Sequence, residues 1–332
     1  MAQIPSSAAA RIARVAGHMM RPAPTAGGAG GMLEGQVAII TGSGQGIGAA
    51  AALLFAQHGA AITVCDIDAT KAQSTASSIS AAGGRAIVVA GDVMDPTYAD
   101  KVVAETLKAF GKVSDSLLTL LHSGRFYVGY VDQYSREQRW LHVGCCDTQD
   151  DGQAMEHNVP RANGAPPSFP LLTVFTRLDC HATAPFRLIR ALASHFRSSA
   201  ETNKVVINIS STSGLHGNAG QLNYSAAKSA VLGMTKTIAK EWGSFGVRCN
   251  AVAFGFIDTR LTQSKGNSAV EVDGQKVVLG IPDGMRDMAV AMIPLQRHGT
   301  PEEAAGGILM LVSPYAAYVS GHTLEVTGGF GI

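Results

Sequence analysis

Charged and aromatic residues are scarce in this chain of 332 residues. Charged residues make up 15% of it, aromatic residues 6%, and the formal net charge is +1. Such a balance gives no electrostatic reason to bind nucleic acid or acidic lipid. No run of 18 apolar residues occurs, so a membrane-spanning helix is not expected. We therefore expect neither nucleic acid nor a membrane as a partner, whereas a hydrophobic content of 46% is enough to fill a large core.

Patterns typical of disulfide and metal sites are also missing. The five cysteines are scattered without a CxxC pair, and the ten histidines show no HExxH spacing. Cys65 and Cys249 lie in or beside apolar runs, where we expect buried thiols. These features favour a reducing compartment and argue against a metal site.

Acidic residues are absent from the start of the chain. Arg11, Arg14 and Arg21 stand among serine and alanine, and the first acid is Glu34. A basic segment without acids is typical of an organelle transit peptide, and the alternative is a disordered tail that ends in a glycine linker. We therefore exclude residues 1–31 from the fold and expect one folded domain at 32–332. The mitochondrial matrix is the expected location, with the cytoplasm as the alternative.

Short apolar runs alternate with helical patterns from residue 35 onward. Alternation of this kind predicts parallel β–α–β units with right-handed crossovers. The sequence thus predicts an α/β fold with a doubly wound parallel sheet of the Rossmann type, in a single domain. The expected strands are 36–41, 61–66, 85–93, 204–210, 246–253 and 323–329, and the expected helices are 47–59, 69–82, 96–110, 183–197, 222–243 and 301–312.

The region 113–178, where a fourth strand belongs, is atypical. It has little periodicity, and its second half carries Pro160, Pro166, Pro167 and Pro170, which argue against regular elements. So long a loop inside a compact domain is unusual. Two interpretations stay open, an error in the gene model that replaces strand four and a lineage-specific insertion. In either case the segment "SLLTLLHS" (116–123) is a candidate substitute strand.

A glycine-rich loop, "TGSGQGIG" (41–48), joins the first expected strand to the first expected helix. Glycines at this point let a pyrophosphate approach the backbone, and the helix that begins near its end offers free N–H groups to an anion. The position in the first β–α–β unit, more than the glycines alone, predicts a dinucleotide site. The loop residues assigned to the cofactor are Gly42, Ser43, Gln45, Gly46, Ile47 and Gly48.

Acidic residues follow the second and third expected strands. Asp66 stands where a carboxylate binds the adenosine ribose hydroxyls in dinucleotide folds, with Ile67 beside it. A 2′-phosphate about 4 Å away would be repelled by roughly 4 kcal/mol, and the glycine loop offers no cation, so we predict NAD rather than NADP. Asp92 is expected to bind the adenine amine and Val93 to line the adenine pocket. A solvated strand end and an ordinary turn are the alternatives for the two aspartates.

The segment "NYSAAK" (223–228) places Tyr224 and Lys228 four residues apart on one helix face. To accept a proton at neutral pH, the pKa of a tyrosine must fall by about three units, roughly 4 kcal/mol. We expect the ammonium of Lys228 to lower that pKa, and Ser211, after the strand 204–210, to hold a substrate oxygen. The arrangement predicts proton transfer coupled to hydride transfer, although such pairs also occur by chance on helices.

These motifs together resemble the short-chain dehydrogenase/reductase family. The similarity extends over 33–112 and 180–330 and includes "TGSGQGIG", "NYSAAK", "GFIDTRLT" and "EVTGG". It is greatest to the 3-oxoacyl-[acyl-carrier-protein] reductase branch, and "VCDID" also resembles the mitochondrial NAD-dependent 17β-hydroxysteroid dehydrogenases. The family implies catalytic roles for Ser211, Tyr224 and Lys228, with Tyr224 and Lys228 also beside the nicotinamide ribose. Gly255, Ile257 and Thr259 would lie at the carboxamide.

The resemblance also implies a substrate and an assembly. An acyl thioester or another ketone or alcohol would bind beneath a mobile lid at 256–290, in a homotetramer or heterotetramer. The expected reaction interconverts a 3-hydroxyacyl and a 3-oxoacyl thioester. The alternatives are a catalytically impaired NAD-binding subunit and a steroid or polyol dehydrogenase.

Three departures from the family pattern are visible. The Asn-Asn-Ala-Gly motif that follows strand four in the family is missing. His181 replaces an asparagine that supports the active-site lysine through water. We expect the histidine, which can also hydrogen-bond, to take over that catalytic role, and an ordinary residue at a helix start is the alternative. Phe254 replaces the proline of a Pro-Gly pair, and we expect its ring to crowd the nicotinamide.

Overall fold

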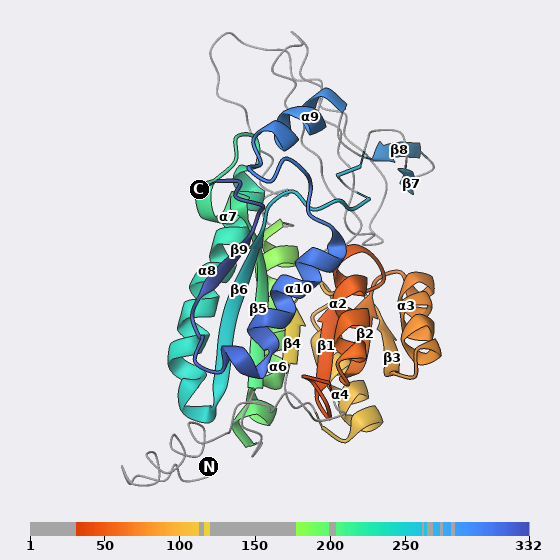
Figure 1. Cartoon of the computed structure of the whole chain (residues 1–332). Helices are drawn as coiled ribbons and strands as arrows, with labels where there is room; N and C mark the ends of the chain where they lie inside the picture. Colours follow the sequence, from red (N-terminus) through yellow and green to blue (C-terminus); the bar gives the residue numbers. More distant parts are fainter. Residues whose placement is uncertain are drawn as a thin grey trace.

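The computed structural model describes residues 31–112, 116–119, 177–198, 204–260, 262–263, 268–272, 275–279 and 283–331. The predictions for residues 1–30 and for nearly all of 113–176 lie outside these ranges. Within them the main element is a seven-stranded parallel sheet with the order β3-β2-β1-β4-β5-β6-β9 (Figure 1). The predicted doubly wound parallel sheet is thereby confirmed.

The strands of this sheet are short, and β1, β2, β5 and β6 are apolar and almost wholly buried, as strands covered on both faces should be. They are β1 (Val37–Thr41), β2 (Ala61–Asp66), β3 (Arg85–Ala90), β4 (Ser116–Thr119), β5 (Lys204–Ser211), β6 (Val247–Phe254) and β9 (Thr323–Val326). A separate antiparallel pair consists of β7 (Ser268–Val272) and β8 (Gln275–Leu279).

Helices cover both faces of the sheet. They are α2 (Gly46–Gln57), α3 (Ala69–Ala81), α4 (Tyr98–Phe110), α6 (Ala184–Ser198), α7 (Thr212–His216), α8 (Leu222–Trp242), α9 (Asp283–Ala291) and α10 (Pro301–Val312). A π-helical turn, η1 (Asp179–Thr183), precedes α6, and 3₁₀ turns lie at η2 (Gly243–Phe245) and η3 (Pro314–Ala316).

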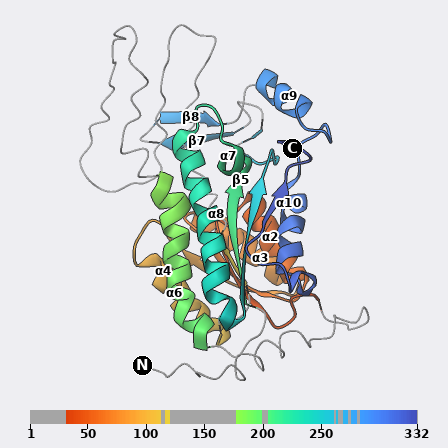
Figure 2. The same ribbon diagram turned by 90° about the vertical axis from the view of Figure 1, so that its left-hand side faces the viewer.

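Two hydrophobic clusters form the core, one on each face of the sheet. Side chains of α2, α3 and α10, such as Phe55 and Ile308, fill the first cluster. Side chains of α4, α6 and α8, such as Val102 and Phe196, fill the second. Figure 2 shows the two helical layers on either side of the sheet. Each helix therefore buries its apolar side against the strands, and the site lies where the strands end.

Strand β4 occupies the centre of the sheet, although the sequence around it is irregular. Its residues pair in parallel with β1, Ala38 opposite Ser116, and with β5, Leu118 opposite Ile207. The prediction that residues from 116 onward supply a substitute strand is therefore confirmed for Ser116–Thr119. The strand order reverses between β1 and β4, and at such a point the carboxyl ends of the strands form a ligand-binding crevice.

Helix boundaries follow local capping signals. Asp68 caps α3 by accepting a hydrogen bond from the Lys71 N–H, and Gly111 ends α4 in the left-handed region. Thr300 and Glu303 form a reciprocal capping box at the start of α10. The predicted ends differ from the observed ones by at most three residues, because the last expected strand positions are turns.

The segment predicted as a lid contains more regular structure than expected. Helix α9 and the β7–β8 pair lie beyond the carboxyl ends of the main strands (Figure 1). The chain after α9 is held to the segment after β9, because the Leu295 N–H donates to the Gly328 carbonyl at 3.1 Å. None of the helices described is long and apolar enough to span a bilayer.

Candidate active site

The glycine loop has the conformation that a close-approaching ligand requires. Gly42 and Gly46 have φ values of 66° and 58°, which are costly for any residue with a side chain. A Cβ added to Gly48 would lie 2.1 Å from the Gly42 carbonyl oxygen, so no larger residue fits there. Ile47, in the first turn of α2, is buried. Gln45 precedes that turn in extended conformation. The loop therefore exposes backbone at a helix N-terminus, where phosphate groups bind.

Ser43 supports this loop from inside the protein. Its hydroxyl donates to the Ile40 carbonyl at 2.7 Å and accepts from the Cys65 N–H at 3.0 Å. The side chain is fully buried. Ser43, which we assigned to the cofactor from the sequence, thus has its hydroxyl engaged within the fold and acts on the site through the shape of the loop.

Asp66 is held rigidly at the end of β2 and faces the glycine loop. One carboxylate oxygen accepts from the Gly44 N–H at 2.9 Å, and the other accepts from the Asp68 N–H at 3.0 Å. A Cβ on Gly44 would lie 2.8 Å from the carboxylate and 3.0 Å from the Cβ of Lys71. The first turn of α3 therefore brings a lysine, paired with Asp68 at 2.8 Å, close to the carboxylate. Sequence reasoning missed Lys71 because it considered only cations inside the loop.

The residues assigned to the adenine side lie around the ends of β2 and β3. Asp92 accepts a hydrogen bond from the Met94 N–H at 2.9 Å, which is the turn geometry noted as its alternative role. Ile67 is 45% exposed beside Asp66. Val93 lines a small cavity together with Thr41, Tyr98, Ala99, Ala184, Pro185 and Leu188.

The four predicted catalytic residues come together at the carboxyl end of β5. Ser211 caps α7, and its hydroxyl accepts from the Ser213 N–H at 3.2 Å and hydrogen-bonds to Tyr224. The ring of His181 meets the Tyr224 ring edge-on, with 5.4 Å between centroids. The Nζ of Lys228 lies 5.8 Å from the Tyr224 ring centroid and donates to the Ile209 carbonyl at 2.9 Å. The Ser211 hydroxyl, the Lys228 amine and the His181 imidazole thus lie around the Tyr224 phenol.

His181 belongs to the π-helical turn η1, which the sequence did not predict. The residue is 3% exposed, and the turn packs against α8. π-helical turns inside helices occur frequently at functional sites, because they reposition side chains and carbonyls. Cys180 of this turn and Arg177, which lies two residues before it, are both buried and act electrostatically on Tyr224 and Lys228. Neither residue was identified from the sequence, since no motif marks them.

The pKa values of this cluster differ from the expectation. Burial raises the pKa of Tyr224, while its hydrogen bond with Ser211 and the charge of Arg177 lower it. Burial also lowers the pKa of Lys228 from 10.5 to about 8. The expected fall in the pKa of the phenol is thus wrong for the free protein: the pKa is raised, because the loss of hydration outweighs the groups that lower it.

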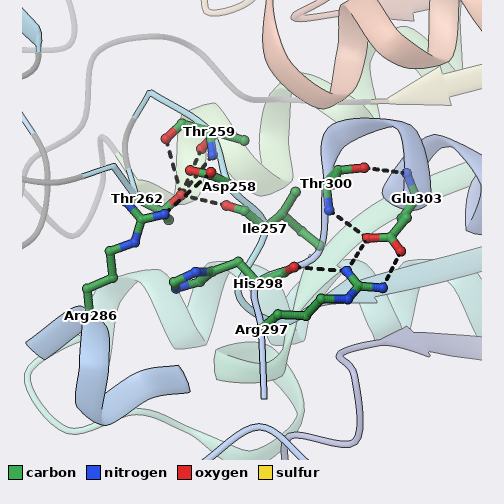
Figure 3. A network of polar contacts seen from close by, with 9 residues as sticks. All are labelled: Ile257, Asp258, Thr259, Thr262, Arg286, Arg297, His298, Thr300 and Glu303. Carbon is green, nitrogen blue, oxygen red and sulfur yellow. Dashed lines mark hydrogen bonds and ion pairs between the residues drawn. The ribbon is translucent and has the colours of Figure 1, made fainter. Parts of the chain in front are cut away.

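The residues assigned to the nicotinamide end lie opposite the glycine loop. A Cβ on Gly46 would lie 3.8 Å from the Thr259 methyl carbon. The Thr262 hydroxyl fixes this loop, since it accepts from the Thr259 N–H at 2.8 Å and donates to the Ile257 carbonyl at 2.5 Å (Figure 3). Ile257 also bridges to Gly299.

The same loop is tied to the lid, and a second ion pair lies close by at the start of α10 (Figure 3). Asp258 forms an ion pair with Arg286 of α9 at 3.4 Å. Arg297 pairs with Glu303 of α10 through two hydrogen bonds of 2.7 and 2.6 Å, which lower the pKa of Glu303 to about 2. Burial and the Arg286 charge lower the pKa of His298, whose ring lies between these pairs.

Phe254 differs from what we expected. Its side chain is 5% exposed and belongs to the core cluster, and its backbone pairs with Ser211 and Val326. The expectation that the ring crowds the nicotinamide is therefore wrong, because the ring packs among core side chains. Gly255 follows where the chain passes close to β9, since a Cβ there would lie 3.0 Å from the Thr327 Cα.

Comparison with known proteins identifies the family. Residues 36–119 match the family described as short chain dehydrogenase, and residues 173–331 match the one described as enoyl-(acyl carrier protein) reductase. A 3-oxoacyl-[acyl-carrier-protein] reductase of Synechocystis is 32% identical over 299 residues, which cover 90% of this chain and 97% of the relative. The chain is a short-chain dehydrogenase/reductase. It is therefore an oxidoreductase of the kind that acts on CH–OH groups.

Other members of the short-chain dehydrogenase/reductase family give the same result. A 3-oxoacyl-[acyl-carrier-protein] reductase of Thermotoga maritima is 29% identical over 300 residues (90% of this chain, 99% of the relative). A (3R)-3-hydroxyacyl-CoA dehydrogenase of Mus musculus is 28% identical over 304 residues (90% and 96%).

Two solved structures share the short-chain dehydrogenase/reductase fold. A dehydrogenase/reductase from Sinorhizobium meliloti superposes with a TM-score of 0.67 at 25% identity and covers 90% of this chain and 96% of its own. A 7α-hydroxysteroid dehydrogenase complexed with NADH and 7-oxo glycochenodeoxycholic acid has a TM-score of 0.66 at 23% identity, with 90% and 95% covered. At that identity the second structure supports the fold alone.

Proposed function

We propose that this chain interconverts a secondary alcohol and a ketone with NAD(H), and that its substrate is a 3-hydroxyacyl/3-oxoacyl thioester. The observation that carries the proposal is the convergence of Ser211, Tyr224 and Lys228 on the carboxyl end of β5. The glycine loop lies at the same edge of the sheet, after β1. The names of the relatives from Synechocystis and Mus musculus favour an acyl substrate.

The residues present fit a dinucleotide. The left-handed glycines, and the close approach of the Gly48 backbone to Gly42, give the tight strand–loop–helix turn that suits a pyrophosphate. Bound NADH would supply the hydride in ketone reduction, and NAD⁺ would accept it in alcohol oxidation. We assign the pyrophosphate to the 42–48 loop and the adenosine ribose to Asp66. We assign the adenine to Ile67, Asp92 and Val93. The nicotinamide ribose we assign to Tyr224 and Lys228, and the carboxamide to Gly255, Ile257 and Thr259.

Side chains of the protein transfer the proton that accompanies the hydride. Ser211 orients the substrate oxygen by hydrogen bonding, and Tyr224 donates its proton to that oxygen in reduction and takes it back in oxidation. Because burial raises its pKa, Tyr224 holds its proton at neutral pH, which suits reduction. His181 positions the Tyr224 phenol through the edge-on contact of the two rings. The buried amine of Lys228 lies beside the same phenol ring.

The proposal is tested by NADH oxidation with acetoacetyl-CoA and purified protein. Wild-type protein is expected to turn over, and Tyr224→Phe is expected to lose at least about 100-fold in kcat. Tyr315→Phe, at an exposed position outside the site, is the matched control and is expected to keep full activity. Tight NADH binding without turnover across a panel of ketones would instead support a non-catalytic subunit, and turnover of steroids or polyols alone would reassign the substrate.

The preference for NAD depends on Asp66 and its surroundings. Asp66→Asn keeps the shape and removes the charge, so the ratio of kcat/KM for NADH over NADPH is expected to fall at least about tenfold. Lys71→Met removes the neighbouring cation and is expected to raise the same ratio. An unchanged ratio in both variants would contradict the assignment of Asp66 to the ribose.

We also propose a tetramer and a mitochondrial location. Phe186 on α6 and Leu222 on α8 are 50% and 63% exposed, which favours burial against further copies. Light scattering after size-exclusion chromatography tests the assembly, and a monomer at micromolar concentration would refute it. Import of a fusion that carries residues 1–31 tests the location, and a fusion that stays in the cytoplasm would refute it.

A further inference from the structure

The glycine loop contains one glycine that its backbone conformation does not require. Gly42 and Gly46 have left-handed φ values, and Gly48 approaches the Gly42 backbone closely. The φ of Gly44 lies outside the left-handed region, so the backbone there would accept other residues. A Cβ at Gly44 would nevertheless lie 2.8 Å from the Oδ2 atom of Asp66, well inside the roughly 3.5 Å of a favourable contact. The need for glycine at this position therefore comes from the Asp66 side chain.

The Asp66 carboxylate rests directly on the backbone of Gly44. Its Oδ2 atom accepts from the Gly44 N–H at 2.9 Å, and its Oδ1 atom accepts from the Asp68 N–H at 3.0 Å. A carboxylate offers about four lone-pair sites, so each oxygen keeps a second acceptor site beside these bonds. The two hydroxyls of an adenosine ribose can use those sites, whereas a 2′-phosphate would bring a like charge to the same place.

Helix α3 prevents the loop from moving away from a side chain at position 44. The same added Cβ would lie 3.0 Å from the Cβ of Lys71, in the first turn of α3. One turn further along, the Thr75 hydroxyl donates to the Gly44 carbonyl at 3.4 Å. Because α3 holds the Gly44 peptide, the short side chain of Asp66 must turn away when a methyl group enters. Turning away breaks the bond between Oδ2 and the N–H of residue 44 and moves the charge.

The Lys71 ammonium is engaged by a different carboxylate. It lies 2.8 Å from the Oδ2 atom of Asp68, whose Oδ1 atom accepts from the Lys71 N–H at 3.1 Å. Both side chains are more than a third exposed, so this ion pair is weak and the ammonium can exchange its partner. Once Asp66 turns away, the lysine remains beside the loop, where its ammonium can bind a 2′-phosphate.

We propose that Gly44 is a positioning residue for the choice of cofactor: having no side chain, it holds the Asp66 carboxylate against the loop, where the charge excludes a 2′-phosphate. This inference rests on the proposed function, in which Asp66 binds the adenosine ribose of NAD(H). It adds that the acid alone does not set the preference. Any residue with a side chain at position 44 weakens the preference for NADH over NADPH, even when Asp66 is retained.

Equilibrium binding of NADH and of NADPH, followed by nicotinamide fluorescence without substrate, tests this role. The wild type is expected to bind NADH at least about tenfold more tightly than NADPH, and Gly44→Ala is expected to lower that ratio at least about tenfold. Gly233→Ala is the matched control, because it lies at an exposed position of α8 where an added Cβ meets no atom within 4 Å. It is expected to leave both affinities unchanged.

A double-mutant cycle shows whether Gly44 acts through the charge of Asp66. Asp66→Asn keeps the shape of the side chain and removes the charge. In the Asp66→Asn background, Gly44→Ala is expected to change the ratio of affinities by less than about threefold, because no charge is left to displace. A glycine that served only the stability of the loop would instead lower both affinities alike and leave the ratio as in the wild type, which would overturn the inference.

If Gly44→Ala does not fold, as judged by circular dichroism, the variant is combined with Asp66→Ala, which removes the carboxylate that the methyl group meets. The double variant is expected to fold and to show the same ratio of affinities as Asp66→Ala alone. A double variant that still fails to fold, or whose ratio differs by more than about threefold, would overturn the inference.

The outcomes separate this inference from the proposed function. A wild type that prefers NADH, with a Gly44→Ala protein that keeps the same preference, overturns the role of Gly44 and leaves the NAD-dependent oxidoreductase intact. A preference that falls in Gly44→Ala, in a protein that turns over no acyl thioester, supports the role of Gly44 and overturns the proposed reaction instead.

Discussion

Substitution of Lys228 by methionine is expected to make the free protein more stable while turnover is lost. Lys228 is 1% exposed, and burial lowers its pKa from 10.5 to about 8. At neutral pH the folded protein therefore carries a buried ammonium at a cost of about 3 kcal/mol relative to the unfolded chain. Methionine has similar length and no charge, but it leaves the Ile209 carbonyl without the amine donor, which costs about 1 kcal/mol. A net gain of about 2 kcal/mol follows.

The stability gained by Lys228→Met is expected to decrease as the pH rises. The unfolded lysine keeps its proton up to about pH 10.5, whereas the folded one loses it near pH 8. Between these values the unfolded state binds more protons, so the unfolding free energy of the wild type rises with pH. The advantage of Lys228→Met should thus be complete below pH 8 and should shrink steadily between pH 8 and 10.5.

Urea denaturation at fixed protein concentration, followed by circular dichroism at pH 7, 8, 9 and 10, measures both effects. Lys236→Met, at an exposed position of the same helix, is the control and is expected to change stability by less than about 0.5 kcal/mol. A Lys228→Met protein that is less stable than the wild type at pH 7 would refute the reasoning, and so would a difference that is constant with pH.

Three further substitutions have defined outcomes. Gly48→Ala places a methyl group 2.1 Å from the Gly42 carbonyl oxygen, so we expect a loss of about 1–3 kcal/mol in the unfolding free energy, measured by denaturation, and weaker NADH binding, measured by fluorescence. Arg286→Gln removes the ion pair that joins the lid to Asp258, and a several-fold higher KM for the cofactor with nearly unchanged stability is expected in steady-state kinetics; an unchanged KM would show that the pair does not position the loop. Arg248→Met removes the buried guanidinium that donates to the carbonyls of Leu311 and Val312, whereas Val319 keeps its donor from Asn250, and calorimetry should show a melting temperature several degrees lower.

The sequence was most informative where physical constraints act locally. A backbone position with left-handed φ or with very close backbone neighbours requires glycine, and glycine can be read from the sequence. Gly42, Gly46 and Gly48 could therefore be assigned to the loop from the sequence alone. Helical spacing likewise predicted that Tyr224 and Lys228 share a face, and they do. The alternation of apolar runs predicted the order of strands and helices, because each run must be buried on both sides.

Other features depend on contacts between distant segments, and the sequence does not show them. The π-helical turn at 179–183 is a change in hydrogen-bond register, and no residue type marks it. Arg177 acts on Tyr224, and Lys71 approaches Asp66, only through tertiary packing. The sign of the Tyr224 pKa shift was wrong because the depth of burial, rather than the neighbouring lysine, controls it.

The four-residue strand at the middle of the sheet has a consequence for the chemistry. Elements proposed to bind the pyrophosphate and the adenosine follow β1, β2 and β3, whereas those proposed to bind the nicotinamide and to move the proton follow β5 and β6. Among the residues that the structure describes, the pairing of Ser116–Thr119 with β1 and β5 joins the two halves of the sheet. A slip of one residue along a strand corresponds to about 3.3 Å, more than hydride transfer tolerates. Because the pyrophosphate end and the nicotinamide end of the cofactor are assigned to different halves of the sheet, a substitution that shifts the pairing of β4 would displace one end relative to the other and slow hydride transfer.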